Sequence, residues 1–312
     1  MELKSVMKSI LEAEMSDGHH IHVVKYFPEQ SPIGHIHLLH GMAEHIERYD
    51  EFALFLVRKG YIVSGHDHRG HGRTVEKNGQ QGYFAETNGF ERVTEDVREV
   101  LLKVRENMVE IPLILFGHSM GSFVARRYMQ KYSDSLSKVI ICGTSYSPGI
   151  LGDVGSIIGK IASKLQAPTT ESKLLNNLSF GGFNKKINDA VTTFDWLNTD
   201  KTEVKKYIED PMCGFISTNQ FYIDLFYGLK IIHKTGEVER IRKDLPVLLI
   251  SGEEDPVGKN GEDIFKVAKG LTNAGMKNVT VHLVENARHE ILLEKNKQDT
   301  FNIIVKWMMN NE

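Results

Sequence analysis

The chain has 312 residues and a mass of 35.4 kDa, which suits one large domain with an insertion or two modest domains. Its net charge of −3 argues against a nucleic acid partner, because there is no basic excess to release counterions. No stretch approaches roughly 18 apolar residues and no signal-peptide core is visible, so we expect a cytoplasmic protein. Cys142 and Cys213 are too few for a disulfide framework, and we expect them to be buried, reduced thiols.

The predicted elements alternate between strands and helices along most of the chain. Segments 7–14 and 20–27 flank the turn sequence Ser-Asp-Gly and predict an antiparallel hairpin. Further apolar segments predict buried strands, at 35–39, 61–64, 112–116, 138–142, 246–250 and 279–284. Amphipathic segments between most of them predict helices, at 52–58, 90–105, 122–132 and 262–274. This alternation predicts an α/β fold with a mostly parallel, eight-stranded, doubly wound sheet.

One long segment, residues 145–237, departs from this alternation. It contains helical patterns at 157–165, 202–208 and 220–233, separated by loops rich in Asn, Gly and Thr, and no buried strand. A connection of this length is too long for an ordinary loop within a compact domain. We therefore predict a core of residues 1–144 and 238–312, with residues 145–237 inserted as a helical cap.

The most informative motif is Gly-His-Ser-Met-Gly at residues 117–121, directly after a predicted buried strand. A serine with glycine two positions away on each side can occupy a strained turn between a strand and a helix, with its hydroxyl exposed. The motif predicts that Ser119 is a nucleophile and that an acid and then a histidine follow on loops after later strands. Both are present, because Asp255 follows the strand at 246–250 and His289 follows the strand at 279–284.

These three residues have the chemistry of a catalytic triad. A serine hydroxyl is too weakly acidic to attack an ester unaided, so His289 would accept the proton of Ser119 while Asp255 orients the imidazole. Glu253 and Glu254 compete with Asp255 as the acid, and we favour Asp255 because it is shorter and is held by a proline turn.

Ester cleavage also requires N–H donors for the oxyanion of the tetrahedral intermediate. The backbone amide of Met120 follows the nucleophile at a helix N-terminus, where the helix dipole favours negative charge. The backbone amide of Met42 follows the strand at 35–39. We predict that these two amides form the oxyanion hole, a role in which their side chains do not matter.

Four segments together resemble the monoacylglycerol lipase and lysophospholipase branch of the α/β-hydrolase fold. They are His-Gly-Met-Ala-Glu-His at 40–45, Asp-His-Arg-Gly-His-Gly at 67–72, the motif at 117–121, and Asp-Pro-Val-Gly at 255–258. The cap segments 195–197 and 210–215 look like those of bacterial members. The sequence departs from the family at Ala43, Thr74 and Ser122. The resemblance implies an α/β-hydrolase fold and a serine hydrolase without metal or cofactor, which cleaves carboxylic esters of lipid-like substrates.

The resemblance also suggests where a substrate would bind. Glu44 and Arg48 could meet a glycerol-like leaving group, although their spacing equally suits a surface ion pair between residues i and i+4. His118 beside the nucleophile and Ile158 in the cap are further candidates. Ile158 lies on the apolar face of the helix predicted at 157–165, which could line an acyl tunnel, pack on the core or touch a membrane surface transiently.

Other interpretations of these residues were weighed. The histidines at 66, 68 and 71 lack the acid at position 70 that a di-zinc hydrolase requires, so we expect a hydrogen-bonded polar loop that includes Asp67 and Arg69. A catalytically inactive binding protein usually lacks a triad member, whereas all three are present here. A small-molecule carboxylesterase, a thioesterase and a peptidase share the same triad and stay open as alternatives.

Overall fold

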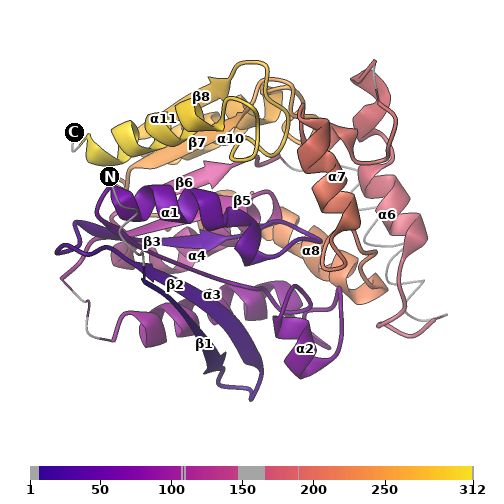
Figure 1. Cartoon of the computed structure of the whole chain (residues 1–312), viewed down its shortest axis with the longest axis horizontal. Coiled ribbons are helices and arrows are strands. Elements are labelled where there is room, and N and C mark those ends of the chain that lie inside the picture. The colour runs from indigo at the N-terminus through magenta and orange to yellow at the C-terminus, as the bar shows by residue number, and fades with distance from the viewer. Residues whose placement is uncertain (1–6, 107, 109, 147–165, 189, 311–312) are drawn as a thin grey trace.

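A computed structural model describes residues 7–106, 108, 110–146, 166–188 and 190–310 of the chain. An eight-stranded sheet runs through the centre of the molecule (Figure 1), with strands β1 (Met7–Glu14), β2 (His20–Phe27), β3 (Gly34–Leu39), β4 (Tyr61–His66), β5 (Leu113–His118), β6 (Lys138–Cys142), β7 (Val247–Gly252) and β8 (Val279–Val284). Their spatial order is β1-β2-β4-β3-β5-β6-β7-β8. β2 is antiparallel to both of its neighbours, and all other pairs are parallel. The predicted sheet, including its opening hairpin, is confirmed.

The central strands form because their apolar residues are covered on both faces. Every residue of β3, β4, β5 and β7 is buried. Parallel strands buried on both faces have continuous apolar sequences, which is why the sequence located them to within about two residues. β1, at the edge of the sheet, is mostly exposed and pairs only with β2.

Helices cover both faces of the sheet. They are α1 (Asp50–Arg58), α2 (Thr74–Asn78), α3 (Gly89–Val104), α4 (Met120–Tyr132), α6 (Lys173–Phe180), α7 (Lys201–Glu209), α8 (Asn219–Ile231), α9 (Thr235–Val238), α10 (Glu262–Asn273) and α11 (Lys297–Met309). One core packs α1 and α11 against the sheet, with the rings of Phe52 and Phe301 4.9 Å apart. The second core packs α3, α4 and α10 against the other face. Two cores on opposite faces are expected for a doubly wound sheet.

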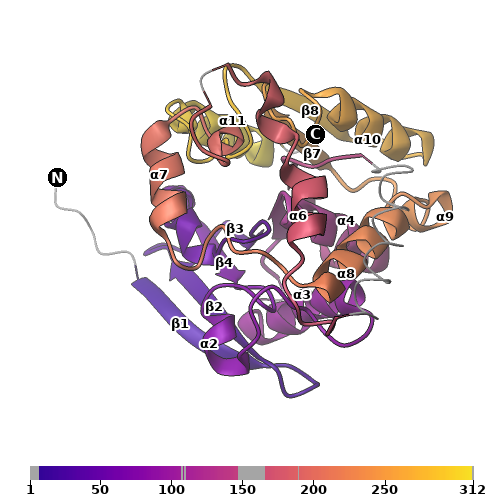
Figure 2. The ribbon, with the colours of Figure 1, turned by 90° about the vertical axis from the view of Figure 1, so that its right-hand side faces the viewer.

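The described part of the segment between β6 and β7 consists of helices and loops, and its β structure is one isolated bridge between Glu171 and Thr218. Its helices α6 and α7 lie beyond the carboxyl ends of the strands (Figures 1 and 2). The helices predicted at 202–208 and 220–233 correspond to α7 and α8. The helix predicted at 157–165, with Ile158, lies outside the described residues.

α8 packs with the core. It contacts α3 and α4, and Phe221, Tyr222 and Leu225 belong to the same apolar cluster as the sheet residues beneath those helices. The division of the chain into core and cap stays a prediction.

The described helices are too short or too polar for a transmembrane segment. None of those in the described parts of the chain is long and apolar enough to cross a membrane. The cytoplasmic location predicted from the sequence stays a prediction. Both cysteines are buried and free of disulfide bonds, as expected.

Candidate active site

Ser119 lies on a tight turn between β5, which ends at His118, and α4, which begins at Met120. Its φ of 52° and ψ of −119° are strained for a residue with a side chain. A Cβ atom at Gly117 would collide with the carbonyl of Gly121, and one at Gly121 would collide with the carbonyl of Leu39. The two glycines of the motif therefore permit the close packing that holds Ser119 in this conformation.

Asp255 and His289 form a buried, hydrogen-bonded pair. His289 Nδ1 donates to Asp255 Oδ2 over 2.9 Å, and the hydroxyl of Ser251 donates to the same oxygen over 2.9 Å. The backbone N–H of Val257 donates to the other carboxylate oxygen of Asp255. Glu253, by contrast, is exposed, as is its neighbour Glu254. The geometry therefore favours Asp255 among the three candidate acids, and its catalytic role stays a prediction.

The pair shifts both pKa values toward the charged states. Burial raises the pKa of Asp255, but the charge of His289 and hydrogen bonds from His289, Val257 and Ser251 outweigh it, so this pKa lies below the ordinary value of 3.8. Burial lowers the pKa of His289, but Asp255 outweighs it and holds this pKa above 6.5. A carboxylate that favours the imidazolium is what a general base beside a serine requires.

The second nitrogen of His289 is available for proton transfer. Its Nε2 atom is buried and has no hydrogen-bond partner within the described residues. Because Nδ1 donates to Asp255, a neutral His289 carries its lone pair on Nε2. His289 and Ser119 line the same cavity. The structure thus places Ser119 and His289 on one cavity, with Asp255 hydrogen-bonded to His289.

The predicted oxyanion loop lies against the nucleophile. A Cβ atom at Gly41 would be 3.1 Å from the Cβ atom of Ser119. The backbone N–H groups of Met42 and Met120 donate no hydrogen bond to any described residue. Unpaired N–H groups beside the nucleophile are suited to bind an oxyanion, although this role stays a prediction. The next residue, Ala43, has a φ of 52°, a left-handed conformation that favours glycine.

Glu44 and Arg48 do form an ion pair, but it is buried rather than on the surface. Glu44 accepts from Arg48 over 2.8 Å and from the backbone N–H of Gly41 over 2.5 Å. Arg48 also donates to both carboxylate oxygens of Glu290, over 2.6 and 3.0 Å. Burial raises the pKa of Glu44, but Arg48 outweighs it and lowers this pKa to about 2. Arg48 therefore links the oxyanion loop to the residue after His289.

This network limits what Glu44 and Arg48 can offer a substrate. Glu44 lines the main cavity, whereas Arg48 lines only a small neighbouring recess with His118. His118 lines both, packs its ring 4.6 Å from that of His289, and has its pKa lowered to about 3 by burial. Contact of these residues with substrate stays a prediction. Glu290 was missed by the sequence analysis, because no local pattern indicates a partner 242 residues from Arg48.

The cavity that contains Ser119 and His289 has a volume of about 230 Å³. The inserted segment supplies most of its wall, including the aromatic residues Phe180, Phe194, Trp196 and Phe215. The ring of Trp196 stacks on Phe180 at 6.0 Å and lies 5.2 Å from His289. The inserted segment thus surrounds Ser119 and His289 with both aromatic and polar side chains, the latter including Asn176 and Asn184.

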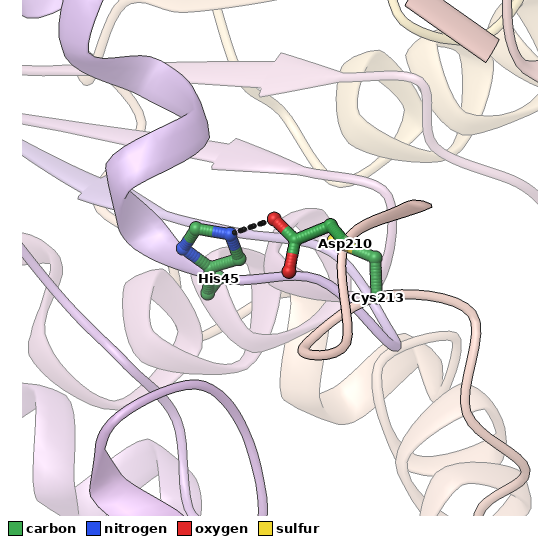
Figure 3. A group of neighbouring side chains, drawn as sticks. All are labelled: His45, Asp210 and Cys213. Carbon is green, nitrogen blue, oxygen red and sulfur yellow. Dashed lines mark hydrogen bonds and ion pairs between the residues drawn. The ribbon is translucent and has the colours of Figure 1, made fainter. Parts of the chain in front are cut away.

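The inserted segment is fastened to the oxyanion loop. Tyr207 Oη and the backbone N–H of Gly214 both donate to the carbonyl of Ala43, each over 2.9 Å. Two residues from Ala43, His45 Nε2 is 2.9 Å from Asp210 Oδ2 (Figure 3). Hydrogen bonds therefore join the cap loop 210–214 to the loop that carries the predicted oxyanion donor.

One group of described residues has the composition of a metal site. Ligand atoms of His45, Asp210 and Cys213 all lie within 4.8 Å of one another (Figure 3). His45 and Asp210 already satisfy each other, and burial raises the pKa of the Cys213 thiol, so a metal would have to displace a tightly held proton. Within the described chain, the histidines at 66–71 form no such group. There Asp67 accepts from the backbone N–H groups of Ile46 and Arg73, as expected for a polar structural loop.

Fold and site together define a hydrolase of the α/β-hydrolase class. The chain belongs to the family described as serine aminopeptidase, S33, whose sequence model matches residues 30–296. It is 29% identical to the monoglyceride lipase of Rattus norvegicus over 77% of this chain and 71% of that protein. A thermostable carboxyl esterase from Bacillus coagulans, solved in complex with glycerol, has a TM-score of 0.89 and 27% identity, with 97% of this chain and 98% of that chain covered. A lipase solved in an open form has a TM-score of 0.87 and 26% identity, over 96% and 98% of the two chains.

These similarities confirm the predicted α/β-hydrolase fold and the resemblance to monoacylglycerol lipases. The chain is therefore a hydrolase with this fold, whereas the roles of its individual residues stay predictions.

Proposed function

We propose that the protein hydrolyses carboxylic esters of lipid-like substrates, such as a monoacylglycerol or a lysophospholipid, through an acyl-enzyme on Ser119. The observation that carries this proposal is the free Nε2 of His289, backed by Asp255, in the same aromatic-walled cavity as Ser119. The monoglyceride lipase of the rat and the esterase that bound glycerol are consistent with such substrates.

The geometry supports a two-step reaction. Ser119 Oγ attacks the ester carbon while His289 Nε2 takes its proton, and the N–H groups of Met42 and Met120 bind the oxyanion. Collapse of the intermediate expels the alcohol, which receives the proton from His289 and leaves the acyl group on Ser119. Water then attacks the acyl-enzyme, with His289 again as the base, and releases the acid and free enzyme.

The size of the cavity suits an acyl chain. Its wall combines aromatic side chains with the polar side chains of Asn176, Asn184 and Thr193. A 150 Å³ cavity accommodates benzene, so 230 Å³ accommodates about nine non-hydrogen atoms. This corresponds to a short or medium acyl chain in the conformation described. An assay panel distinguishes the alternatives, which are a small-molecule carboxylesterase, a thioesterase and a peptidase. It compares p-nitrophenyl esters from acetate to palmitate with monoacylglycerol, lysophospholipid, thioester and aminoacyl-naphthylamide substrates.

Substitutions in the triad test the mechanism. Ser119→Ala and His289→Ala are expected to lower kcat by several orders of magnitude and leave a small residual rate from the oxyanion donors. Asp255→Asn is expected to cost far more activity than Glu254→Gln, its matched control, because only Asp255 contacts His289 among the acids compared. Full activity in Ser119→Ala, or complete loss of wild-type activity with EDTA, would contradict the proposal.

We also propose that the cap touches a membrane surface transiently while the enzyme takes up lipid substrates. Leu174 and Leu178, one turn apart on α6, are 57% and 59% exposed. Two large apolar side chains that face solvent at a cavity wall are suited to shallow insertion between lipid headgroups.

A further inference from the structure

A second cavity of about 280 Å³ is lined by residues of α4, α9 and α10 and of the segments next to α9. It shares no described lining residue with the catalytic cavity. Apolar side chains form much of its wall, including Met129, Ile232, Val267 and Leu271. Its charged group is Arg126, which reaches it from α4.

Arg126 is a buried cation without an anionic partner in the described structure. Its side chain is only 4% exposed, and its hydrogen bonds go to the carbonyl of Ser145, the hydroxyl of Thr144 and Nε2 of His233. His233 is a neutral acceptor, because its Nδ1 donates to the carbonyl of Leu229 over 2.6 Å. Burial lowers the pKa of Arg126 to about 9, and no carboxylate offsets this effect. Such a charge is costly to bury unless an anion accompanies it.

The neighbouring residue shows what an ordinary arginine does in this helix. Arg127 forms ion pairs with Glu91 over 2.9 Å and with Glu237 over 2.6 Å. Both arginines belong to α4 and both are mostly covered, yet only Arg127 has carboxylates around it. Among the described residues, the cavity therefore combines one uncompensated cation with apolar side chains and neutral polar ones such as Gln130 and Asn273.

We propose that this second cavity binds a medium-chain carboxylate, with the carboxylate on the guanidinium of Arg126 and the alkyl chain against the apolar wall. Arginine pairs with carboxylates through two parallel hydrogen bonds, which supplies the missing countercharge. Scaling from the 150 Å³ that accommodate benzene, 280 Å³ accommodate about eleven non-hydrogen atoms. Octanoate, with eight carbons and two oxygens, is a probe of that size. The inference does not depend on the proposed ester hydrolysis.

Calorimetric titration with octanoate tests this site in four proteins. We expect saturable binding to the wild type and to Arg127→Gln, and at least tenfold weaker binding to Arg126→Gln and Arg126→Met. Any binding in the catalytic cavity is common to all four proteins and cancels in the comparison. Octanol, which has the same chain without the charge, is expected to bind the wild type at least tenfold more weakly than octanoate. Equal affinity of wild type and Arg126→Gln for octanoate, or no saturable binding, would overturn the proposal.

The thermal melting temperature without ligand checks that the variants are folded. Removal of an unpaired buried charge is expected to leave this temperature unchanged or higher. A structure of the wild-type protein crystallised with octanoate gives an answer without any substitution. A carboxylate within hydrogen-bond distance of Arg126 supports the site, and an empty cavity in that crystal overturns it.

Discussion

At the scale of single residues, backbone strain in the catalytic region falls on Ser119 and Ala43, each with a φ of 52°. Such conformations cost roughly 1–3 kcal/mol each and persist only where the surroundings determine them. Ser119 is fixed by glycines that allow close contacts, and Ala43 by two hydrogen bonds to its carbonyl. The strain at Ser119 could be predicted from the motif. The strain at Ala43 was visible only as a departure from the family pattern.

The predicted triad came from local motifs and chain order, since each member lies on a loop that follows a strand. The Glu44–Arg48 pair was also suggested by its spacing, but its link to Glu290 could not be found in this way, because Glu290 approaches Arg48 only after the chain has folded. Loop residues far apart in the sequence carry no shared periodicity, so their contacts depend on the tertiary fold.

The pH dependence of kcat/KM reports on His289. The base must be neutral to accept a proton, and Asp255 raises its pKa above 6.5, so activity is expected to fall on acidification with a midpoint above pH 6.5. In Asp255→Asn the burial of His289 is no longer opposed by this carboxylate, and the midpoint of the residual activity should move to lower pH. If the midpoint is the same in both enzymes, a group other than His289 controls the loss of kcat/KM at acidic pH.

Arg48 is expected to be a positioning residue that both stabilises the fold and supports catalysis. Arg48→Gln leaves Glu44 and Glu290 buried without their cation, a change that typically costs about 3–5 kcal/mol of unfolding free energy. Urea denaturation measures this loss, and kcat should fall because the oxyanion loop and the His289 loop are no longer linked.

Arg73→Gln is the matched control, because Arg73 pairs with Glu47 on the surface and its side chain is 43% exposed. The unfolding free energy of Arg73→Gln should fall by no more than about 1 kcal/mol. The double variant Arg48→Gln/Glu290→Gln should recover part of the stability lost in Arg48→Gln. If Arg48→Gln and Arg73→Gln are equally stable, the buried ion pairs of Arg48 do not contribute to the stability of the fold.

At the scale of elements, the sequence predicted strands better than helices. Buried strands have continuous apolar sequences, whereas the short helices α2 and α9 have too few turns for a recognisable period. α11 was not predicted, although Phe301, Ile304, Val305 and Met308 have helical spacing and face the core. α8 was predicted as a helix, but its assignment to the cap could not anticipate that it packs on α3 and α4.

The outer face of α6 tests the proposed membrane contact. Leu174→Glu/Leu178→Glu is expected to lower the rate on monoacylglycerol in anionic vesicles by at least tenfold, because burial of one leucine in lipid contributes about 2 kcal/mol. The rate on soluble p-nitrophenyl butyrate should not change. Leu102→Glu is the control, since Leu102 is 63% exposed on α3, away from the cavity wall. Equal vesicle rates for the double variant and the control would argue against contact through α6.

At the scale of the whole molecule, a chain of buried hydrogen bonds crosses the sheet between β3 and β4. Arg105 donates to His35 Nδ1 over 3.1 Å, so His35 Nε2 must donate to the hydroxyl of Ser64. That hydroxyl then donates to His37 Nδ1, and His37 Nε2 donates to His66 Nδ1 over 2.9 Å. Every imidazole in this chain is neutral with a single allowed tautomer. The sequence indicated structural histidines here, but not their continuity.

These histidines should make the protein sensitive to acid. Burial lowers the pKa of His35 and of His66 to about 3, and that of His37 well below 6.5, whereas unfolded histidine titrates near 6.5. Between these values the unfolded state binds more protons, so stability is complete above pH 6.5 and is lost as the pH falls below it. Each histidine contributes up to about 1.4 kcal/mol per pH unit.

Urea midpoints measured from about pH 8 to about pH 5.5 test this prediction. The midpoint should be constant at the alkaline end and decrease below pH 6.5. His37→Gln should show a shallower decrease, whatever its stability at pH 8, because it removes one of the groups that resist protonation. A midpoint that is independent of pH over this range would contradict the argument.

The attachment of Tyr207 and Gly214 to the carbonyl of Ala43 has a consequence for the timing of catalysis. Any displacement of this part of the insertion that admits a substrate removes the bonds that hold the neighbouring Met42 N–H in place. The enzyme would then be inactive while the substrate enters, and it would become active only when the inserted segment returns to its closed position. In the open conformation the predicted oxyanion hole is not formed. Water could therefore not hydrolyse an acyl group on Ser119 until the inserted segment closes again. Frequent opening would therefore speed substrate entry but slow the chemical steps. The variant with the highest turnover would hold the inserted segment to Ala43 with intermediate strength.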